Sequence, residues 1–222
     1  MIITLVFLAA LLAFFLGWIL SRSYAVKPWL ADGGSLEPSD PLPQIMTTPR
    51  VGLGVFMAVA SALFALAISA YHMRMEFGED WLSVPSPALL WVNSAVLVLA
   101  SLTLQWSWNA ARRDDGLGMR RWHVAGGFFS VAFMFGQVLV WRDLQAGGYF
   151  MTTNPANAFF YLLTGLHVAH LLGGLVVWVH TSLKFRGGAL PGDVRETIEL
   201  CAIYWHYLLV IWLILFALLL TT

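Results

Sequence analysis

Long apolar runs separated by short polar connections dominate this chain. The uncharged runs cover residues 1–21, 51–73, 81–111, 122–141, 144–183 and 200–222. A helix needs about 20 mainly apolar residues to cross a bilayer, whereas the strands of a membrane barrel are short and alternate in polarity. The pattern predicts an all-α, polytopic transmembrane bundle of six helices, at 2–20, 51–72, 88–109, 122–140, 156–183 and 199–220. Within the longer runs, prolines are expected to mark helix starts, at Pro85, Pro87 and Pro155.

The connection over residues 21–50 is much longer than the others and divides the chain into three parts. It is rich in proline and glycine, so it is expected to run extended rather than to fold by itself. The sequence therefore predicts an N-terminal transmembrane helix (1–20), a cytoplasmic linker (21–50) and a five-helix domain (51–222).

Composition agrees with a membrane protein and adds an orientation. Hydrophobic residues make up 59% of the chain and charged residues only 11%, which excludes an ordinary soluble domain. Basic residues concentrate in the first, third and fifth connections, which places these connections in the cytoplasm and both termini outside. The ten are Arg22, Lys27, Arg50, Arg112, Arg113, Arg120, Arg121, Lys184, Arg186 and Arg195, against Arg74 and Arg142 elsewhere.

Tryptophans and small residues indicate how the helices meet the bilayer and each other. Indoles close to the predicted helix ends are expected to anchor the bilayer interfaces: Trp106, Trp108, Trp122 and Trp141. Small residues are expected where two helices approach closely. They are Ala58-x-x-x-Ala62 in the second predicted helix, Gly126, Gly127 and Gly136 in the fourth, and Ala169-x-x-x-Gly173 in the fifth.

Polar groups at membrane depth are few, and they usually face the interior of a bundle. They are Ser61, Asn93, Ser94, Gln137, Thr164, His167, His170, Glu199, Tyr204 and His206. Glu199 is the only carboxylate among them, so a relay built from several carboxylates cannot lie within this chain. It shares a helical stripe with His206, seven residues later. The single cysteine, Cys201, excludes an intrachain disulfide and metal sites that need several thiolates.

The histidines raise the possibility of haem ligation. His167 and His170 lie one turn apart, but His180 is thirteen residues from His167 and so points elsewhere on the helix. Membrane haem is usually held between histidines of facing helices, and His72 and His123 fall close to predicted loops. We therefore expect interhelical hydrogen bonds, with no catalytic residue and no metal in this chain. An independent b-type cytochrome using His167, His170, His180 and His206 is the alternative of a different class.

Two motifs carry a resemblance to a known family. T-G-x-H-x-x-H is present at Thr164, Gly165, His167 and His170. A glutamate followed by Y-W-H, with a further tryptophan, is present at Glu199, Tyr204, Trp205, His206 and Trp212. The segments around Asn93 and Gln137 agree more loosely. Over residues 51–222 the chain resembles subunit III of the haem–copper respiratory oxidases, which take electrons from cytochrome c or quinol.

The resemblance implies a non-catalytic subunit. In that family the haems and copper lie in the partner catalytic subunits, so the implied partners are subunit I, subunit II and membrane phospholipids, with no nucleic acid. The implied role is to stabilise the catalytic subunit, to hold phospholipid in a cleft that leads oxygen inward, and to support proton uptake. The implied location is the bacterial cytoplasmic membrane. The motif residues, with Asn93 and Gln137, are then expected to make interhelical polar or lipid contacts.

The chain departs from the family pattern at two carboxylate positions. Ala62 follows Ser61 where the family usually has an acidic residue, and Leu209 replaces an aspartate. Both losses weaken a role in proton uptake, and they keep open a second reading, an accessory protein of nitric oxide reductase.

Overall fold

The computed structural model describes residues 47–78, 80–85, 87–186 and 191–221. They form α2 (Thr48–Phe77), α3 (Ala88–Arg112), α4 (Gly116–Ala146), α5 (Pro155–Arg186) and α6 (Pro191–Thr221). All five are long and apolar enough to cross a membrane, which confirms the predicted all-helical, membrane-spanning fold for this part of the chain. The predicted helix at 2–20 and nearly all of the linker lie outside the described residues.

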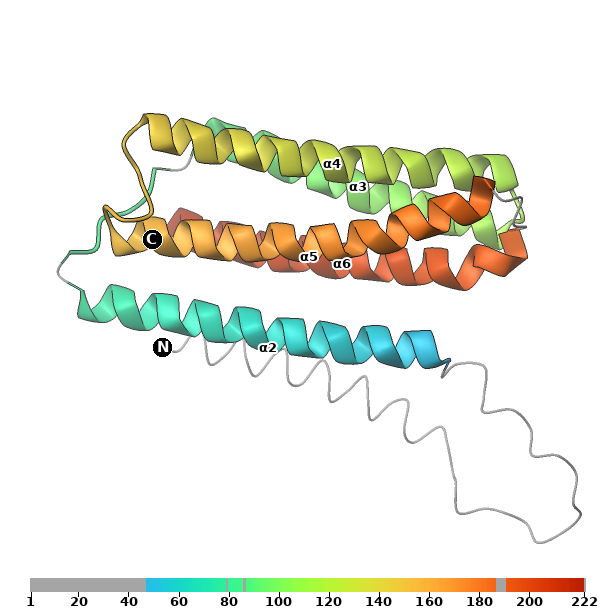
Figure 1. Cartoon of the computed structure of the whole chain (residues 1–222), viewed down its shortest axis with the longest axis horizontal. Coiled ribbons are helices and arrows are strands. Elements are labelled where there is room, and N and C mark those ends of the chain that lie inside the picture. Colours follow the sequence, from blue (N-terminus) through green and yellow to red (C-terminus); the bar gives the residue numbers. More distant parts are fainter. Residues whose placement is uncertain (1–46, 79, 86, 187–190, 222) are drawn as a thin grey trace, which may run out of the picture. The chain divides into compact units, whose positions relative to one another are not determined.

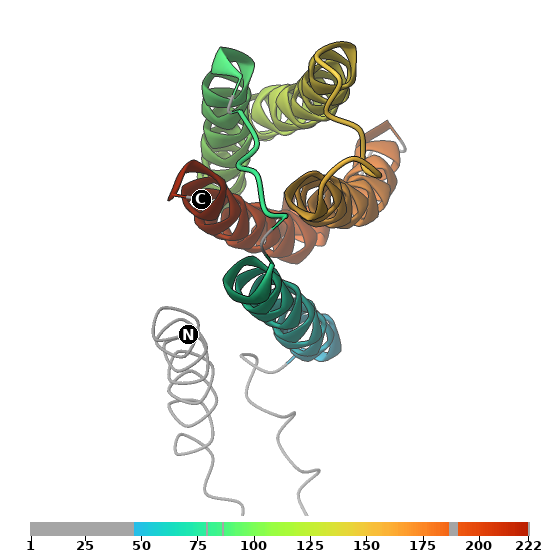
Figure 2. The same ribbon diagram turned by 90° about the vertical axis from the view of Figure 1, so that its left-hand side faces the viewer.

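The chain divides into two compact units, Met1–Glu76 and Phe77–Thr222. In the first, the structure describes α2 up to Glu76 and the residue before the helix, which begins inside the predicted linker. In the second, α3 to α6 run alongside one another (Figure 1). Seen end on, these four helices form a ring in the order α3, α4, α5, α6 (Figure 2). The α3–α4 pairing is the most extensive of the four contacts around the ring, and the α4–α5 pairing is the least.

Prolines begin several of these helices, as the sequence suggested. Pro87 precedes α3 in an extended conformation, and Pro155 is the first residue of α5. Pro191, which was not singled out, begins α6. Proline suits the first helical position because its φ is already helical and its missing N–H would have no helical acceptor there.

All five helices are longer than predicted, and two of them begin well before their apolar runs. The fourth begins at residue 116 rather than 122, and the last begins at 191 rather than 199. The added turns carry charged residues, which the sequence pattern assigned to loops. Leu117 is exposed, but Met119, Val194 and Ile198 are fully enclosed. The added turns therefore bury apolar side chains on one face, as amphipathic helices do.

A tight hairpin joins α3 to α4 through residues 113–115. Asp114 has a φ of 57°, its N–H donates to Ala111 O, and the next N–H, of Asp115, donates to Ala110 O. This is a Schellman ending with aspartate, a residue that tolerates the left-handed region, in the place of glycine. Asp115 then caps α4 by accepting the N–H of Gly118 at 2.9 Å.

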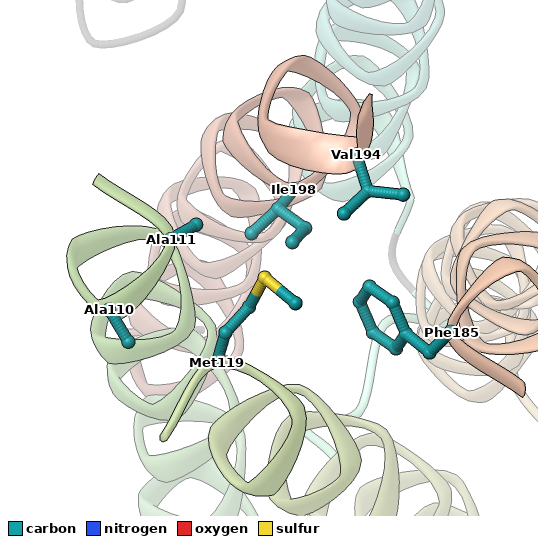
Figure 3. Close-up of a cluster of buried hydrophobic side chains, with 6 residues drawn as sticks. All are labelled: Ala110, Ala111, Met119, Phe185, Val194 and Ile198. Carbon is teal, nitrogen blue, oxygen red and sulfur yellow. The ribbon is translucent and has the colours of Figure 1, made fainter. Parts of the chain in front are cut away.

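A hydrophobic core closes the hairpin end of the four-helix unit. Side chains from all four helices point toward one another there (Figure 3). We call these residues the hairpin-end core: Ala110, Ala111, Met119, Phe185, Val194 and Ile198. They pack the ends of all four helices against one another beside the α3–α4 connection.

Candidate functional site

The polar side chains inside the four-helix unit form the candidate site. Asn93 of α3 donates its amide N–H to the Gln137 side-chain oxygen of α4 at 3.2 Å, and both residues are buried. Gly136 makes this approach possible, since a Cβ on it would lie 2.3 Å from Asn93 Oδ1. The two residues that the sequence placed on separate helices are therefore brought together.

Two motif tryptophans of α6 donate to serines on neighbouring helices. Trp205 Nε1 donates to Ser130 Oγ of α4 at 2.7 Å, and Trp212 Nε1 donates to Ser94 Oγ of α3 at 2.8 Å. Both indoles are fully buried. Ser130 and Ser94 each also donate to a carbonyl of their own helix at 2.7 Å. Each serine oxygen therefore links its own helix to α6.

His206 attaches α6 to α3 through both of its ring nitrogens. Nε2 lies 2.8 Å from Gln105 Oε1, and Nδ1 is hydrogen-bonded to Ser101 Oγ. A carbonyl oxygen only accepts, so Nε2 carries the proton and Nδ1 of the neutral ring accepts from the serine hydroxyl. Ser101 and Gln105 are four residues apart and present neighbouring positions on one face of α3.

Thr164, the first residue of the T-G-x-H-x-x-H motif, attaches α5 to α4. Its hydroxyl oxygen accepts the Trp141 indole N–H at 3.1 Å and donates to Phe160 O at 2.7 Å. On the other side of α5, the Tyr204 hydroxyl of α6 donates to the backbone carbonyl of His170 at 3.0 Å.

The histidines of this motif have different surroundings. His167 is fully buried between aromatic rings, with centroids 5.9 Å from Phe133 and 5.1 Å from Trp212. The ring of His170 is partly exposed, and its Nδ1–H donates to Leu166 O of its own helix at 2.8 Å. Within the described ranges, no cluster of three or more His, Cys, Asp or Glu side chains is placed to hold a metal ion.

Glu199 lies outside this polar interior. It is partly exposed on α6, one residue after Ile198 of the hairpin-end core. His206, two turns further along α6, is also partly exposed.

The prediction that His123 lies close to a loop is wrong. His123 lies in the extended first part of α4 and is fully buried. Its Nε2–H donates to Trp178 O at 3.3 Å, while Trp178 Nε1 donates back to His123 O at 2.8 Å. The two rings stack with centroids 5.4 Å apart. A Cβ on Gly127 would fall 2.1 Å from the indole, so glycine is needed here for α4 and α5 to approach.

Other contacts also depart from the expectations. Ser101, Gln105 and Ser130 were not singled out, although serine or glutamine in an apolar helix is the signal that would have pointed to them. The close approaches predicted at Gly126, Gly127 and Gly136 are confirmed, by Leu104, Trp178 and Asn93 respectively. The prediction of a close helix approach at Gly173 is wrong for the described part of the chain, because a Cβ on Gly173 would meet nothing within 4 Å.

Comparison with known proteins decides the family. A sequence model of cytochrome c oxidase subunit III matches residues 45–221. The chain belongs to the cytochrome c oxidase subunit III family. The resemblance inferred from the two motifs is thereby confirmed, and the polar interior described above is that of a subunit III.

Relatives from distant bacteria support this assignment over most of their length. The chain is 30% identical over 173 residues to cytochrome c oxidase subunit 3 of Thermostichus vulcanus, covering 76% of this chain and 85% of the relative. It is 32% identical over 162 residues to the probable cytochrome c oxidase subunit 3 of Mycobacterium tuberculosis (strain ATCC 25618 / H37Rv), covering 70% and 77%. The corresponding Synechocystis protein is 29% identical over 175 residues, covering 75% and 72%. The chain is accordingly an integral membrane protein and a subunit III of a multisubunit haem–copper oxidase.

Proposed function

We propose that this chain is a non-catalytic subunit that stabilises the oxygen-reducing subunit of its complex. One observation carries the proposal: the motif residues are used to join helices. Trp205, His206 and Trp212 donate from α6 to α3 or α4, and Thr164 accepts from α4. Side chains engaged in this way build a rigid bundle that can support a neighbouring subunit.

In this proposal the chemistry takes place in partner chains. Subunit I, with subunit II, holds the haems and copper, takes electrons from cytochrome c or quinol, and reduces oxygen to water. The names of the bacterial relatives favour cytochrome c as the donor. The chain is then expected to lie in the bacterial cytoplasmic membrane with both termini on the outer side, because its basic connections favour the cytoplasm.

A lipid role belongs to the same proposal. The family resemblance supports bound phospholipid that eases the passage of oxygen toward the catalytic subunit. Support for proton uptake is weaker in this chain, because Ala62 and Leu209 replace the carboxylates of the family pattern. We therefore propose that any proton-collecting acid of the complex lies elsewhere.

The test is the composition and spectrum of the complex isolated gently through a tag on this chain. We expect co-purifying catalytic subunits with an oxygen-reducing haem–copper centre. A partner with a haem–non-haem-iron centre would instead support the nitric oxide reductase accessory protein, which the two missing carboxylates keep in view. A Soret band that stays with this chain after it is separated from every other subunit would establish the b-type cytochrome and overturn the proposal.

A further inference from the structure

The α3–α4 hairpin concentrates positive charge at one end of the four-helix unit. Its exposed arginines are Arg112, Arg113, Arg120 and Arg121. The hairpin has two carboxylates of its own, and both are engaged elsewhere. Asp114 binds Arg195 of α6 at 2.7 Å, and Asp115 caps α4. Within the described part of the chain, no carboxylate lies at ion-pair distance from the four arginines.

Aromatic rings hold two of these guanidinium groups in place. Arg112 Cζ lies 5.1 Å from the ring centroid of Trp108, and Arg120 Cζ lies 5.9 Å from that of Phe185. Phe185 belongs to the hairpin-end core and Trp108 packs against it. The arginine stems therefore lie over apolar surface while their charged ends stay outside, which limits how far they can move.

An indole pair lies deeper along the same hairpin. Trp106 of α3 and Trp122 of α4 are 44% and 40% exposed, and their rings meet edge to face with centroids 4.8 Å apart. Arg113 follows Trp106 by seven residues, which places it on almost the same face of the helix and two turns nearer the end. Charge at the surface with an exposed indole pair beneath it matches the layers of a membrane interface.

We propose that this hairpin is a binding site for an anionic phospholipid. The phosphate would accept hydrogen bonds from the guanidinium groups, whose planar fork suits phosphate oxygens, and the acyl chains would lie against Trp106 and Trp122. The apolar indole surface directly below the charges favours a lipid over an acidic protein segment, which would need polar partners at that depth. This site does not depend on the lipid role proposed above, which is assigned to no element of the chain.

The experiment uses the intact oxidase complex in nanodiscs of phosphatidylcholine with a trace of photoactivatable phosphatidylglycerol. Crosslinked peptides are then located by mass spectrometry. We expect labelling of the α3–α4 hairpin that unlabelled phosphatidylglycerol competes away, while inorganic phosphate and phosphatidylcholine do not. Each arginine near an anionic surface is expected to strengthen binding about fivefold. The double variant Arg113→Gln/Arg121→Gln should therefore weaken labelling by an order of magnitude or more.

Matched variants distinguish the loss of these particular arginines from the loss of positive charge in general. Lys184→Gln removes an exposed charge from the α5 end outside the arginine cluster and should leave labelling unchanged. Arg113→Lys/Arg121→Lys should restore most of the labelling lost in the glutamine variant, with subunit content and haem spectrum as checks on assembly. The inference is overturned if the arginine substitutions leave the amount of labelled hairpin peptide unchanged, or if photoactivatable phosphatidylcholine labels the hairpin equally well. It is also overturned if the wild-type hairpin takes no label because a partner subunit covers it. If the glutamine variant does not assemble, the competition series on the wild-type complex decides alone.

Discussion

The α3–α6 and α4–α5 interfaces join helices of the same unit by different means. Between α3 and α6 the contacts run from side chain to side chain, as in Trp212 with Ser94 and His206 with Ser101. Between α4 and α5, Trp141 donates to the Thr164 side chain, but at the other end of the interface His123 and Trp178 each donate to the other's backbone carbonyl, beside Gly127. The first interface depends on the side-chain chemistry of both partners, whereas the His123–Trp178 part of the second depends on how closely the two backbones approach.

The largest expected effect is at the first interface. Trp212→Ala would remove a fully buried indole and leave a cavity beside His167 and Phe133, which costs about 3–5 kcal/mol for a large aromatic residue. The measurement is the temperature at which the chain dissociates from the detergent-solubilised complex. Trp91→Ala is the control, because Trp91 is 59% exposed. Equal losses for the two variants would contradict the packing role of Trp212.

Gly127→Ala tests the α4–α5 interface by adding one carbon atom, the alanine Cβ. The new Cβ would lie 2.1 Å from the Trp178 indole, and overpacking of this kind costs about 1–3 kcal/mol. Gly165→Ala on α5 is matched, since a Cβ there meets nothing within 4 Å. It should gain up to about 1 kcal/mol from the better helix propensity of alanine. The unfolding temperature of the complex should therefore fall for Gly127→Ala and rise for Gly165→Ala. A shift in the same direction for both variants would argue against close backbone approach as the determinant.

His167→Ala separates a structural role from a ligand role at the centre of the unit. We expect a loss of about 1–3 kcal/mol, since the smaller side chain leaves space against Phe133 and Trp212. The haem content of the purified complex should not change. His170→Ala, which alters a partly exposed ring bonded to its own helix, should have a smaller effect on stability. Stoichiometric loss of haem from an intact His167→Ala complex would show that the structural interpretation is wrong.

The smallest effect is that of one hydrogen bond. Interhelical hydrogen bonds in membranes contribute about 0.6 kcal/mol on average. Ser94→Ala should therefore lower stability by about this amount, with Trp212 still packed in place. A double-mutant cycle of Ser94→Ala with Trp212→Phe should give a coupling energy of similar size. A coupling near zero would mean that ring packing alone holds the α3–α6 interface.

The sequence allowed the helices to be predicted better than their partners. Apolar runs located all five described helices, because every membrane-spanning helix must carry such a run. The starts of α4 and α6 could not be located in this way, because their first turns carry charged residues such as Arg120 and Glu196, which interrupt the apolar runs. The end of α3 at Asp114 could not be predicted either, because aspartate is a much weaker signal than glycine for a left-handed residue.

The sequence pointed to the candidate polar residues but not to their hydrogen-bond partners. The motif residues were found because polar groups stand out in apolar helices and because their spacing matches a family. Nothing in one sequence links Trp205 to Ser130, which lies 75 residues away. His123 was misplaced because the fourth helix begins at 116 rather than 122, and its partner was not foreseen because a backbone carbonyl, that of Trp178, leaves no trace in the residue pattern.

The serines that accept hydrogen bonds from the α6 tryptophans matter for the order in which the helices can be joined. Ser94 precedes its partner Trp212 by 118 residues, so α3 is synthesised and inserted long before α6 exists. Because Ser94 and Ser130 donate to Leu90 O and Gly126 O of their own helices, each hydroxyl hydrogen has an acceptor that does not depend on α6. The short hairpin of residues 113–115 lets α3 and α4 enter the bilayer as a pair. The α6 tryptophans, which are synthesised last, add donors to serine oxygens whose own hydrogens are already bonded within α3 and α4.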